Sequence, residues 1–374
     1  MKKKILLISV NRSDFGIQRN LIKKLAREND LKFKLLVTGT HLSNSFGHTV
    51  DEIKNDKIRS FNEIKLSDFD YKNQNIINLI SDSTKKFYKY YKTYKPDLVI
   101  ILGDRYEMLS AAIPLITLNI PVVHIHGGEK TEGSFDDIFR NMITACADLH
   151  FVCHDAYKKR VSSIKGNTKN IFNFGSLSLE DVNNLKLKKK NDIEKKFNII
   201  FKKKNILITY HPETKFRGTN KTNINTLFKA IDKFNEINFI FTIPSPDPGN
   251  KDIIKKIENY CNYKKNCYYV KSFGKVYYFS TLKIVDAVLG NSSSGILEVP
   301  SFKKTTINIG DRQLGRLQAI SIINCKLDII DITKSIRKVY SFNQQKLISK
   351  TKNIFYKSNT THNIIKEIKK FLNI

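Results

Sequence analysis

Short, almost uninterrupted apolar runs alternate along the chain with longer segments whose apolar residues recur at helical spacing. Such runs are typical of strands buried on both faces, as in parallel sheets that are covered by helices. In the first half the runs are KKILLISV, FKLLVTG, DLVIILG, PVVHIHG and LHFVC, and the helical segments include IQRNLIKKLAREN and MLSAAIPLITLN. The alternation therefore predicts an α/β fold built on a doubly wound parallel sheet.

The second half of the chain repeats this pattern after a polar, lysine-rich segment that begins near Ser176. Its apolar runs are NILITYHP, NFIFTIP, CYYVKSF, IVDAVLG and TTINIG. A length of 374 residues suits two domains of ordinary size. We expect two Rossmann-like domains, residues 1–176 and 177–355, a C-terminal helix over 356–374, and a ligand cleft between the domains.

The net charge of +30 is the one compositional anomaly. A balance this basic is typical of proteins that bind nucleic acid or an anionic membrane surface. The lysines, however, are spread along the whole chain, as an A/T-rich coding bias would also produce. We expect no nucleic-acid partner; a binding isotherm with random duplex would reveal one through its steep salt dependence.

The N-terminus and the cysteines both favour a cytoplasmic protein. The apolar part of MKKKILLISV is only six residues long and leads into a polar turn, so it predicts a first strand rather than a signal peptide. No stretch approaches the length of a membrane-spanning helix, so we expect no membrane partner. The five cysteines are odd in number and lack CxxC spacing, which favours a reducing compartment and no metal site.

Ionisable and hydroxyl side chains follow nearly every predicted strand. Ligands of open parallel sheets bind at the carboxyl ends of the strands, so these positions are candidates for a functional site. They are residues 11–14, 38–41, 103–105, 124–129, 211–213 and 290–295.

The stretch LGNSSSGILEVPSF carries three consecutive serines at the start of a predicted helix. The unpaired N–H groups and the dipole of a helix N-terminus favour a phosphate or pyrophosphate there. The residues that would add donors are Ser292, Ser293, Ser294 and Gly295. Glu298, one turn later, is placed to accept from a ribose diol, and Arg312 to neutralise phosphate. The alternatives are ordinary serine N-capping and a surface arginine.

A second group of candidates could transfer protons. Asp104 directly follows DLVIILG, and one strand later come His126, Glu129, Asp136 and Asp137. His211, at a strand end of the second domain, would face this acid/base cluster across the cleft. No GxGxxG follows the first strand and no GxxxxGK[ST] occurs, which disfavours hydride-transfer dehydrogenases and P-loop NTPases.

The motifs also occur in a characteristic order along the chain. After NRSDFG and VTGTHLSNSFG come LGDRYEM, HIHGGEKTEG, TYHPET, LGNSSSGILEVPS and TINIGDRQLGR. With this set the chain resembles the bacterial hydrolysing UDP-N-acetylglucosamine 2-epimerases of sialic acid biosynthesis, from residue 3 to about residue 320. The resemblance implies a GT-B-like fold, with a C-terminal helix that crosses back to the first domain.

The activity that the resemblance implies uses a nucleotide-sugar substrate and no nicotinamide, flavin or other cofactor. UDP is eliminated from UDP-N-acetylglucosamine to leave a 2-acetamidoglucal, and water adds to give N-acetylmannosamine. We also expect a homo-oligomer, either a dimer or a tetramer.

The resemblance assigns roles to individual residues. It makes Asp104 and Asp136 catalytic, with His126 sharing the proton transfer and His211 approaching the pyrophosphate. The residues expected to bind the substrate are Arg12, Asp14, Gly16, His41, Arg105, Glu129, Ser292, Ser293, Ser294, Gly295, Glu298 and Arg312. The segment 243–250, IPSPDPGN, is expected to line the base or the sugar.

Other activities stay open at this point. One is the same reaction on a 2,4-diacetamido-trideoxyhexose carried on UDP or GDP, as in the legionaminic acid pathway. Another is a non-hydrolysing epimerase or a GT-B glycosyltransferase, which would return a nucleotide sugar or a glycoside.

Overall fold

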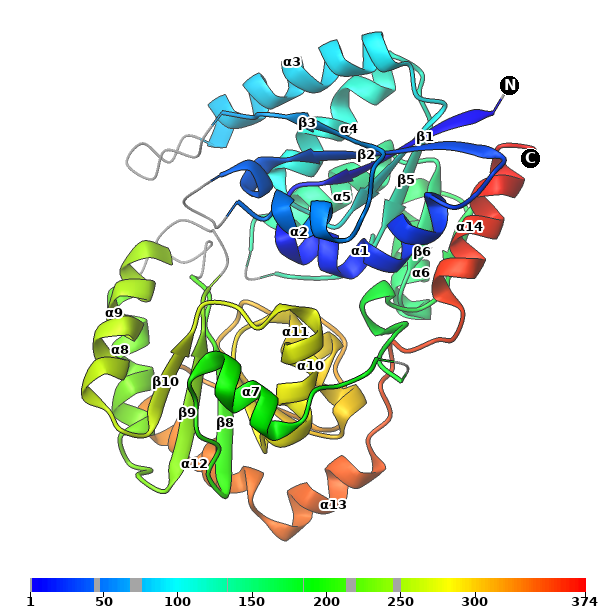
Figure 1. Ribbon diagram of the computed structural model, residues 1–374. Coiled ribbons are helices and arrows are strands. Elements are labelled where there is room, and N and C mark those ends of the chain that lie inside the picture. Colours follow the sequence, from blue (N-terminus) through cyan, green and yellow to red (C-terminus); the bar gives the residue numbers. More distant parts are fainter. Residues whose placement is uncertain are drawn as a thin grey trace. The chain divides into compact units, whose positions relative to one another are not determined.

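The computed structural model describes residues 2–43, 48–67, 76–132, 134–183, 185–212, 220–244 and 250–374 (Figure 1). The chain forms two compact units. Unit 1 comprises residues 1–129, 136–180 and 355–374, and unit 2 comprises residues 130–135 and 181–354. The predicted boundary at Ser176 lies close to Glu180, where the main chain leaves unit 1. Among the described residues, no helix is both long and apolar enough to cross a membrane.

Unit 1 is built on a seven-stranded parallel sheet with the order β3-β2-β1-β4-β5-β6-β7. Its strands are β1 (Lys3–Ser9), β2 (Leu31–Thr38), β3 (Phe61–Ile64), β4 (Leu98–Leu102), β5 (Val122–Ile125), β6 (Leu149–Val152) and β7 (Ile171–Asn173). The helices are α1 (Arg12–Leu25), α2 (Val50–Asn55), α3 (Ile76–Tyr94), α4 (Tyr106–Thr117), α5 (Asp136–Cys146), α6 (Asp155–Lys165) and α14 (Thr360–Phe371), with short 3-10 turns at Gly39–Leu42 and Leu177–Leu179.

Both faces of this sheet are buried, which explains the nearly continuous apolar runs of its central strands. In β1, Ile5 and Leu7 pack with α1, α2 and α14, whereas Leu6 and Ile8 pack with α3, α4 and α5. The strand order reverses direction between β1 and β4, so the loops after these two strands flank the switch point where such sheets bind ligands.

Unit 2 repeats the design with a six-stranded parallel sheet of order β10-β9-β8-β11-β12-β13. Its strands are β8 (Lys204–Thr209), β9 (Ile237–Thr242), β10 (Cys267–Val270), β11 (Ala287–Gly290), β12 (Thr305–Ile309) and β13 (Ile322–Cys325). The helices are α7 (Lys190–Phe197), α8 (Asn220–Ile231), α9 (Asn250–Tyr263), α10 (Gly274–Ile284), α11 (Ser293–Leu297), α12 (Ile329–Val339) and α13 (Phe342–Lys350), with a 3-10 turn at Val299–Phe302. Here the order reverses between β8 and β11, which places His211 and the serine stretch at the switch point.

The C-terminal helix α14 packs within unit 1 against α1, as Figure 1 shows. Its apolar residues Ile364, Ile365 and Ile368 lie in the same core cluster as Leu21 and Leu25 of α1. The helix therefore covers one face of the first sheet, although it is separated from α1 by most of the chain.

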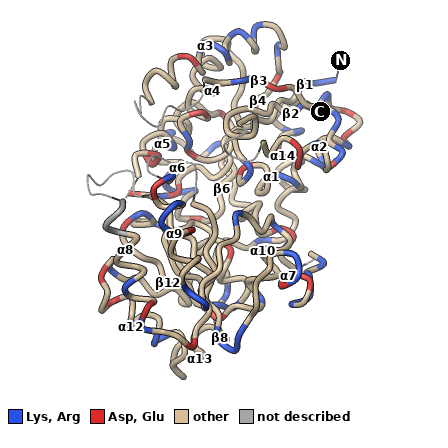
Figure 2. Tube along the Cα trace, turned by 60° about the vertical axis from the view of Figure 1, so that its left-hand side comes forward, with Lys and Arg blue, Asp and Glu red and all other residues tan. Residues whose placement is uncertain are grey.

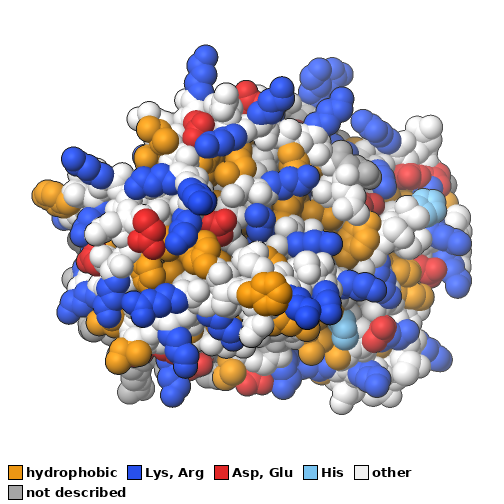
Figure 3. All heavy atoms as spheres, turned by 90° about the horizontal axis from the view of Figure 1, so that it is seen from below, with side chains coloured by type: hydrophobic (Ala, Val, Ile, Leu, Met, Phe, Trp, Pro, Cys, Tyr) orange, Lys and Arg blue, Asp and Glu red, His pale blue; other side chains and the backbone are white. Residues whose placement is uncertain are grey.

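Lysine and arginine residues are distributed over both units (Figure 2). On the face drawn in Figure 3 they alternate with acidic and apolar side chains rather than forming one continuous stripe. This distribution agrees with the compositional explanation of the charge, and the expectation that nucleic acid is not a partner stays a prediction.

Candidate functional site

The loop after β1 is held in place by the N-cap of α1. Asn11 accepts a hydrogen bond from the backbone N–H of Asp14 at 2.9 Å and another from the Ser13 hydroxyl at 2.5 Å. This cap fixes Arg12 and Asp14 at the carboxyl edge of the sheet. Gly16 lies in the first turns of α1, where an added Cβ would contact nothing within 4 Å.

Asp14 occupies a shielded position beside a second acid. Its Oδ2 is buried and has no hydrogen-bond partner among the described residues. Burial raises the pKa of Asp14 to about 7; Arg105 opposes this shift and Glu107 adds to it. Arg105 is itself paired with the buried Glu107, with Nε 3.0 Å from Oε2. The Asp14 carboxyl group therefore changes charge near neutral pH, at the switch point of the first sheet.

His41 is fully buried and bonded on both ring nitrogens. Its Nε2 lies 2.9 Å from the Ser9 hydroxyl and its Nδ1 lies 2.8 Å from the Thr49 hydroxyl. Burial lowers the pKa of His41 to about 3, so the ring is neutral. These contacts tie the end of β1 to the segment before α2; a contact of His41 with substrate stays a prediction.

The loop after β4 brings Asp104 to a buried arginine that the sequence analysis did not single out. Arg140 in α5 donates to Asp104 through Nη2 and to Asp137 through Nη1 at 3.2 Å. Arg160 in α6 donates to the other oxygen of Asp137 at 3.1 Å. Arg140 could have been suspected, because it lies four residues after Asp136 on one face of α5, but its pairing with Asp104 depends on the fold.

The proton-transfer candidates of unit 1 thus gather on adjacent strand ends and the helix that follows them. Asp104 comes from the end of β4, and His126 and Glu129 come from the end of β5. Asp136 and Asp137 occupy the first turn of α5, where a helix dipole favours carboxylates. Hydrogen bonds therefore connect three acidic residues, one histidine and two arginines in unit 1, namely Asp104, Glu129, Asp137, His126, Arg140 and Arg160.

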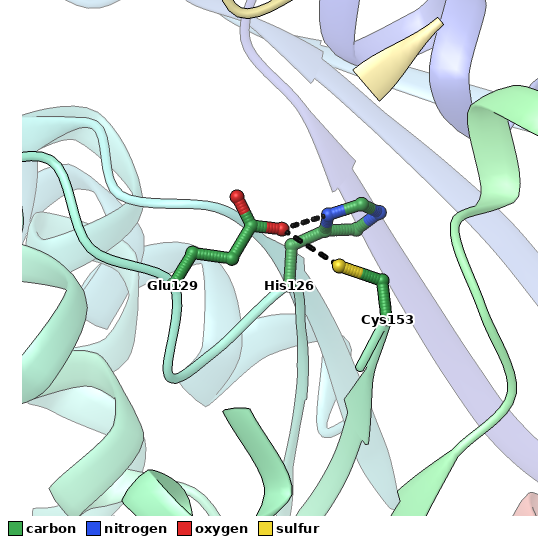
Figure 4. Close-up of side chains that lie close together, drawn as sticks. All are labelled: His126, Glu129 and Cys153. Atoms are coloured by element: carbon green, nitrogen blue, oxygen red, sulfur yellow. Dashed lines mark hydrogen bonds and ion pairs between the residues drawn. The ribbon is translucent and has the colours of Figure 1, made fainter. Parts of the chain in front are cut away.

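His126 and Glu129 form a buried pair with Cys153, which follows β6 (Figure 4). The Oε1 atom of Glu129 lies 2.5 Å from Nδ1 of His126 and 3.2 Å from Sγ of Cys153. The turn between His126 and Glu129 depends on left-handed backbone, with φ of 64° at His126 and 75° at Gly128. A Cβ at Gly128 would lie 2.5 Å from the carbonyl oxygen of Tyr157, so this position requires glycine.

Among the described residues, the potential ligand atoms of these three side chains also lie close enough together to suggest a metal ion. Ligands of a tetrahedral Zn²⁺ ion at bond lengths of about 2.1 Å are roughly 3.4 Å apart. The separation of 2.5 Å between Nδ1 and Oε1 is much shorter and fits a hydrogen bond between the ring and the carboxylate. The arrangement therefore suits a hydrogen-bonded network better than an ion.

In unit 2, Asn291 joins the ends of β8 and β11. It accepts from the backbone N–H of His211 at 2.7 Å and donates to the His211 carbonyl at 2.9 Å. Gly290, with φ of 137°, permits the contact, because a Cβ there would lie 2.0 Å from the carbonyl oxygen of Thr209. The Asn291 carbonyl in turn accepts from Gln313 at 2.9 Å and Arg312 at 3.3 Å. His211 and Arg312 are thereby held at one strand edge.

The three serines have different surroundings. Ser292 is the N-cap of α11, and its hydroxyl lies 3.4 Å from the backbone N–H of Ser294. Ser294 donates to Glu298, and its hydroxyl also lies 2.6 Å from that of Tyr278. The Ser293 hydroxyl, in contrast, bonds to no described residue. Gly295 packs against β12, where its carbonyl accepts from Thr306 at 2.6 Å.

Tyr278 is a member of this group that the sequence analysis missed. Burial raises the pKa of its phenol, and Glu298 raises it further while the bond to Ser294 lowers it. The phenol therefore stays protonated and donates or accepts as a neutral group.

Two predicted regions, Glu213 and residues 245–249, lie outside the described residues.

The comparisons with known proteins agree with this reading of the fold. The chain matches the family model described as UDP-N-acetylglucosamine 2-epimerase over residues 23–369. It is 39% identical over 334 residues to GDP/UDP-N,N'-diacetylbacillosamine 2-epimerase (hydrolyzing) from Campylobacter jejuni, covering 88% of this chain and 86% of that protein. It is 34% identical over 374 residues to polysialic acid biosynthesis protein P7 from Escherichia coli, covering 99% and 94%.

Among solved structures, the chain is similar to UDP-GlcNAc 2-epimerase from Neisseria meningitidis bound to UDP-GlcNAc, with a TM-score of 0.84 at 18% identity. The match covers 98% of this chain and 100% of that one. At this identity the likeness concerns the fold alone. It confirms the predicted fold class of two Rossmann-like α/β domains of the GT-B type.

Proposed function

Because the chain belongs to the UDP-N-acetylglucosamine 2-epimerase family, we propose that it is a hydrolysing 2-epimerase. The proposed reaction converts UDP-N-acetylglucosamine and water into N-acetylmannosamine and UDP, and it serves the synthesis of sialic acid-type sugars. The main support for hydrolysis is the name of the Campylobacter relative, a hydrolysing 2-epimerase that is 39% identical to this chain. The reaction needs no redox cofactor, because elimination and hydration leave the overall oxidation state unchanged.

We assign the proton transfers to residues of unit 1. Elimination removes the weakly acidic C2 proton of the sugar while the bond from C1 to the diphosphate breaks, so the site needs a base held in a fixed position. Asp104 is such a group, because Arg140 holds its carboxylate in place. Asp136 and His126 supply the further proton-transfer groups that the return of a proton to C2 requires.

We assign the stabilisation of the leaving diphosphate mainly to residues of unit 2. Its developing charge needs donors and cations that are already in position before the bond breaks. Ser293 offers a hydroxyl that bonds to no described residue, at the start of α11. Asn291 holds His211 and Arg312 at the same strand edge. Ser292 and Gly295 are the other candidates at this edge for binding the diphosphate. Arg12 of unit 1 is a further candidate for phosphate, and Glu298 for the ribose hydroxyls.

The second candidate substrate is a nucleotide-linked N,N'-diacetylbacillosamine, favoured by the name of the Campylobacter relative. This sugar carries an acetamido group at C4 and a methyl group at C5, where N-acetylglucosamine has a hydroxyl and a hydroxymethyl group. The chemistry at C1 and C2 is the same, so the proposed proton-transfer residues would serve both substrates. The two sugars differ only in the contacts around C4 and C6.

A side-by-side assay of the purified protein separates these substrates. UDP-N-acetylglucosamine, UDP-N,N'-diacetylbacillosamine and its GDP counterpart are incubated separately, and the products are followed by NMR. We expect UDP and free N-acetylmannosamine from the first, with the highest kcat/KM. A higher kcat/KM for a diacetamido sugar would transfer the assignment to that substrate. A product that is still linked to the nucleotide would overturn the hydrolysing activity.

A further inference from the structure

After β5 and β6, the side chains of His126 and Cys153 both contact the same oxygen of the Glu129 carboxylate (Figure 4). We propose that Glu129 and Cys153 are positioning residues, which hold His126 with its proton on Nδ1 and leave Nε2 as the nitrogen that exchanges protons. The proposal rests on the proposed function for the role of His126, but its structural part can be tested without any substrate. It gives Glu129 a different role from the substrate contact that its motif suggests.

The tautomer follows from the chemistry of the contact. An ionised carboxylate can only accept hydrogen bonds, so the Nδ1 atom of His126, 2.5 Å from Glu129 Oε1, must carry the proton. The neutral ring then has its lone pair on Nε2. The Ser176 hydroxyl lies 3.4 Å from Nε2, and it lies 3.1 Å from the hydroxyl of Ser178.

Cys153 supplies a second donor to the Glu129 carboxylate. Its thiol donates to the same Oε1 atom at 3.2 Å, so this oxygen is held between two donors from different strand ends. The thiol is 1% exposed, which keeps it away from solvent reagents and leaves it the role of a hydrogen-bond donor. A carboxylate with one oxygen fixed by two donors cannot rotate freely, and the ring that depends on it cannot flip.

The main chain of Glu129 links this pair to the catalytic carboxylate. Its carbonyl oxygen accepts from Nη1 of Arg140 and from Nη1 of Arg160, each at 2.9 Å. Arg140 also donates to Asp104. One residue therefore holds the histidine through its side chain and, through its carbonyl, the arginine that orients Asp104. The two proton-transfer groups are kept in a fixed relation by this connection.

The first test reads the tautomer directly. Long-range proton–nitrogen NMR spectra of the full-length protein with labelled histidine distinguish a ring protonated on Nδ1 from one protonated on Nε2. The His126 signals are assigned by their loss in His126→Gln. We expect Nδ1–H in the native protein, and a shift toward Nε2–H in Glu129→Gln, because the amide can present either its oxygen or its N–H to the ring. A native His126 protonated on Nε2 overturns the proposal.

The second test compares kinetics in matched variants. Glu129→Gln should lower kcat about 100-fold or more with KM nearly unchanged, by analogy with orienting carboxylates in other acid–base sites. Cys153→Ser keeps a donor and should retain activity within about threefold, whereas Cys153→Ala should lose more and broaden the acidic limb of the pH profile. Full kcat in Glu129→Gln, or one equivalent of zinc bound to the native protein, would overturn the proposal. If no nucleotide sugar is turned over but the tautomer is as expected, the proposed function fails and the positioning role stands.

Discussion

Ser293 and Ser294 are neighbours with opposite surroundings. Ser294 is enclosed between Tyr278 and Glu298, while the Ser293 hydroxyl bonds to no described residue. The sequence presents both as equivalent members of one SSS run. The fold distinguishes their surroundings, because Tyr278 of α10 contacts Ser294 in the first turn of α11.

This difference predicts opposite phenotypes for two similar substitutions. Ser293→Ala should weaken UDP binding at least about tenfold, since a hydrogen bond to a charged oxygen contributes roughly 1.5–3 kcal/mol, and should leave the melting temperature unchanged. Ser294→Ala should instead lower the melting temperature, because Tyr278 and Glu298 lose a hydrogen-bond partner. Calorimetric titration with UDP and thermal melts measure both effects. Unchanged UDP affinity in Ser293→Ala would remove that hydroxyl from the phosphate site.

Asp104 offers a second prediction at this scale. Asp104→Asn preserves the shape of the side chain but removes its basicity, so we expect kcat to fall by roughly 100-fold or more. UDP affinity should change little, because Arg140 keeps Asp137 and the Glu129 carbonyl as partners. Single-turnover kinetics and calorimetry measure the two quantities. Native turnover in Asp104→Asn would exclude the carboxylate from proton transfer.

At the scale of elements, the central strands and the edge strand β10 were predictable, and the other three edge strands were not. The ten apolar runs correspond to β1, β2, β4, β5 and β6 in unit 1 and to β8 through β12 in unit 2. The strands that were missed, β3, β7 and β13, each lie at the edge of a sheet. An edge strand is covered on fewer sides, and the half-exposed residues of β3 and β13 break the apolar run on which the prediction depends.

The C-terminal helix shows the same limit. Its helical spacing was visible in the sequence, and the family resemblance implied that it crosses back to the first domain. Its specific partner α1 was not visible, because the contact joins opposite ends of the chain. Local periodicity reports which face of a helix is buried and carries no information about what covers it. For the same reason the sequence identified Asp104 but not the arginine that pairs with it.

The packing of α14 makes a testable claim about stability. Ile368 is fully buried in the unit 1 core, so Ile368→Ala should cost about 2–5 kcal/mol. The matched control is Ile374→Ala, where the side chain is 45% exposed and the cost should stay within about 0.5 kcal/mol. Hydrogen exchange of the β1 and α1 amides measures the loss. Equal exchange in both variants would contradict the packing of α14 on this core.

At the scale of the whole molecule, the buried histidines are unevenly divided. Burial lowers the pKa of His41 and His150 to about 3 and that of His124 to about 4, and all three lie in unit 1. Both ring nitrogens of His150 lack a hydrogen-bond partner among the described residues. Unit 2 contains a single histidine, His211, at a strand end.

This division predicts that unit 1 is the acid-sensitive unit. An unfolded histidine takes up a proton near pH 6.5, whereas these folded ones do not until pH 3 to 4. The folded state therefore binds fewer protons in this window, and its stability falls as pH falls, by about 2 kcal/mol per histidine at pH 5. Hydrogen exchange at pH 7.5 and pH 5, corrected for intrinsic rates, should show unit 1 losing protection first. Equal losses in both units would contradict the prediction.

The proposed reaction eliminates UDP first and adds water afterwards. The reaction in deuterium oxide, followed by proton NMR in one tube, tests it most directly. The proton at C2 is removed in the elimination and returned from a group that has exchanged with solvent, so the product should carry deuterium at C2. We predict free N-acetylmannosamine, deuterated at C2, appearing together with UDP. A free sugar that keeps its C2 proton would contradict elimination, and a deuterated sugar still attached to UDP would contradict hydrolysis.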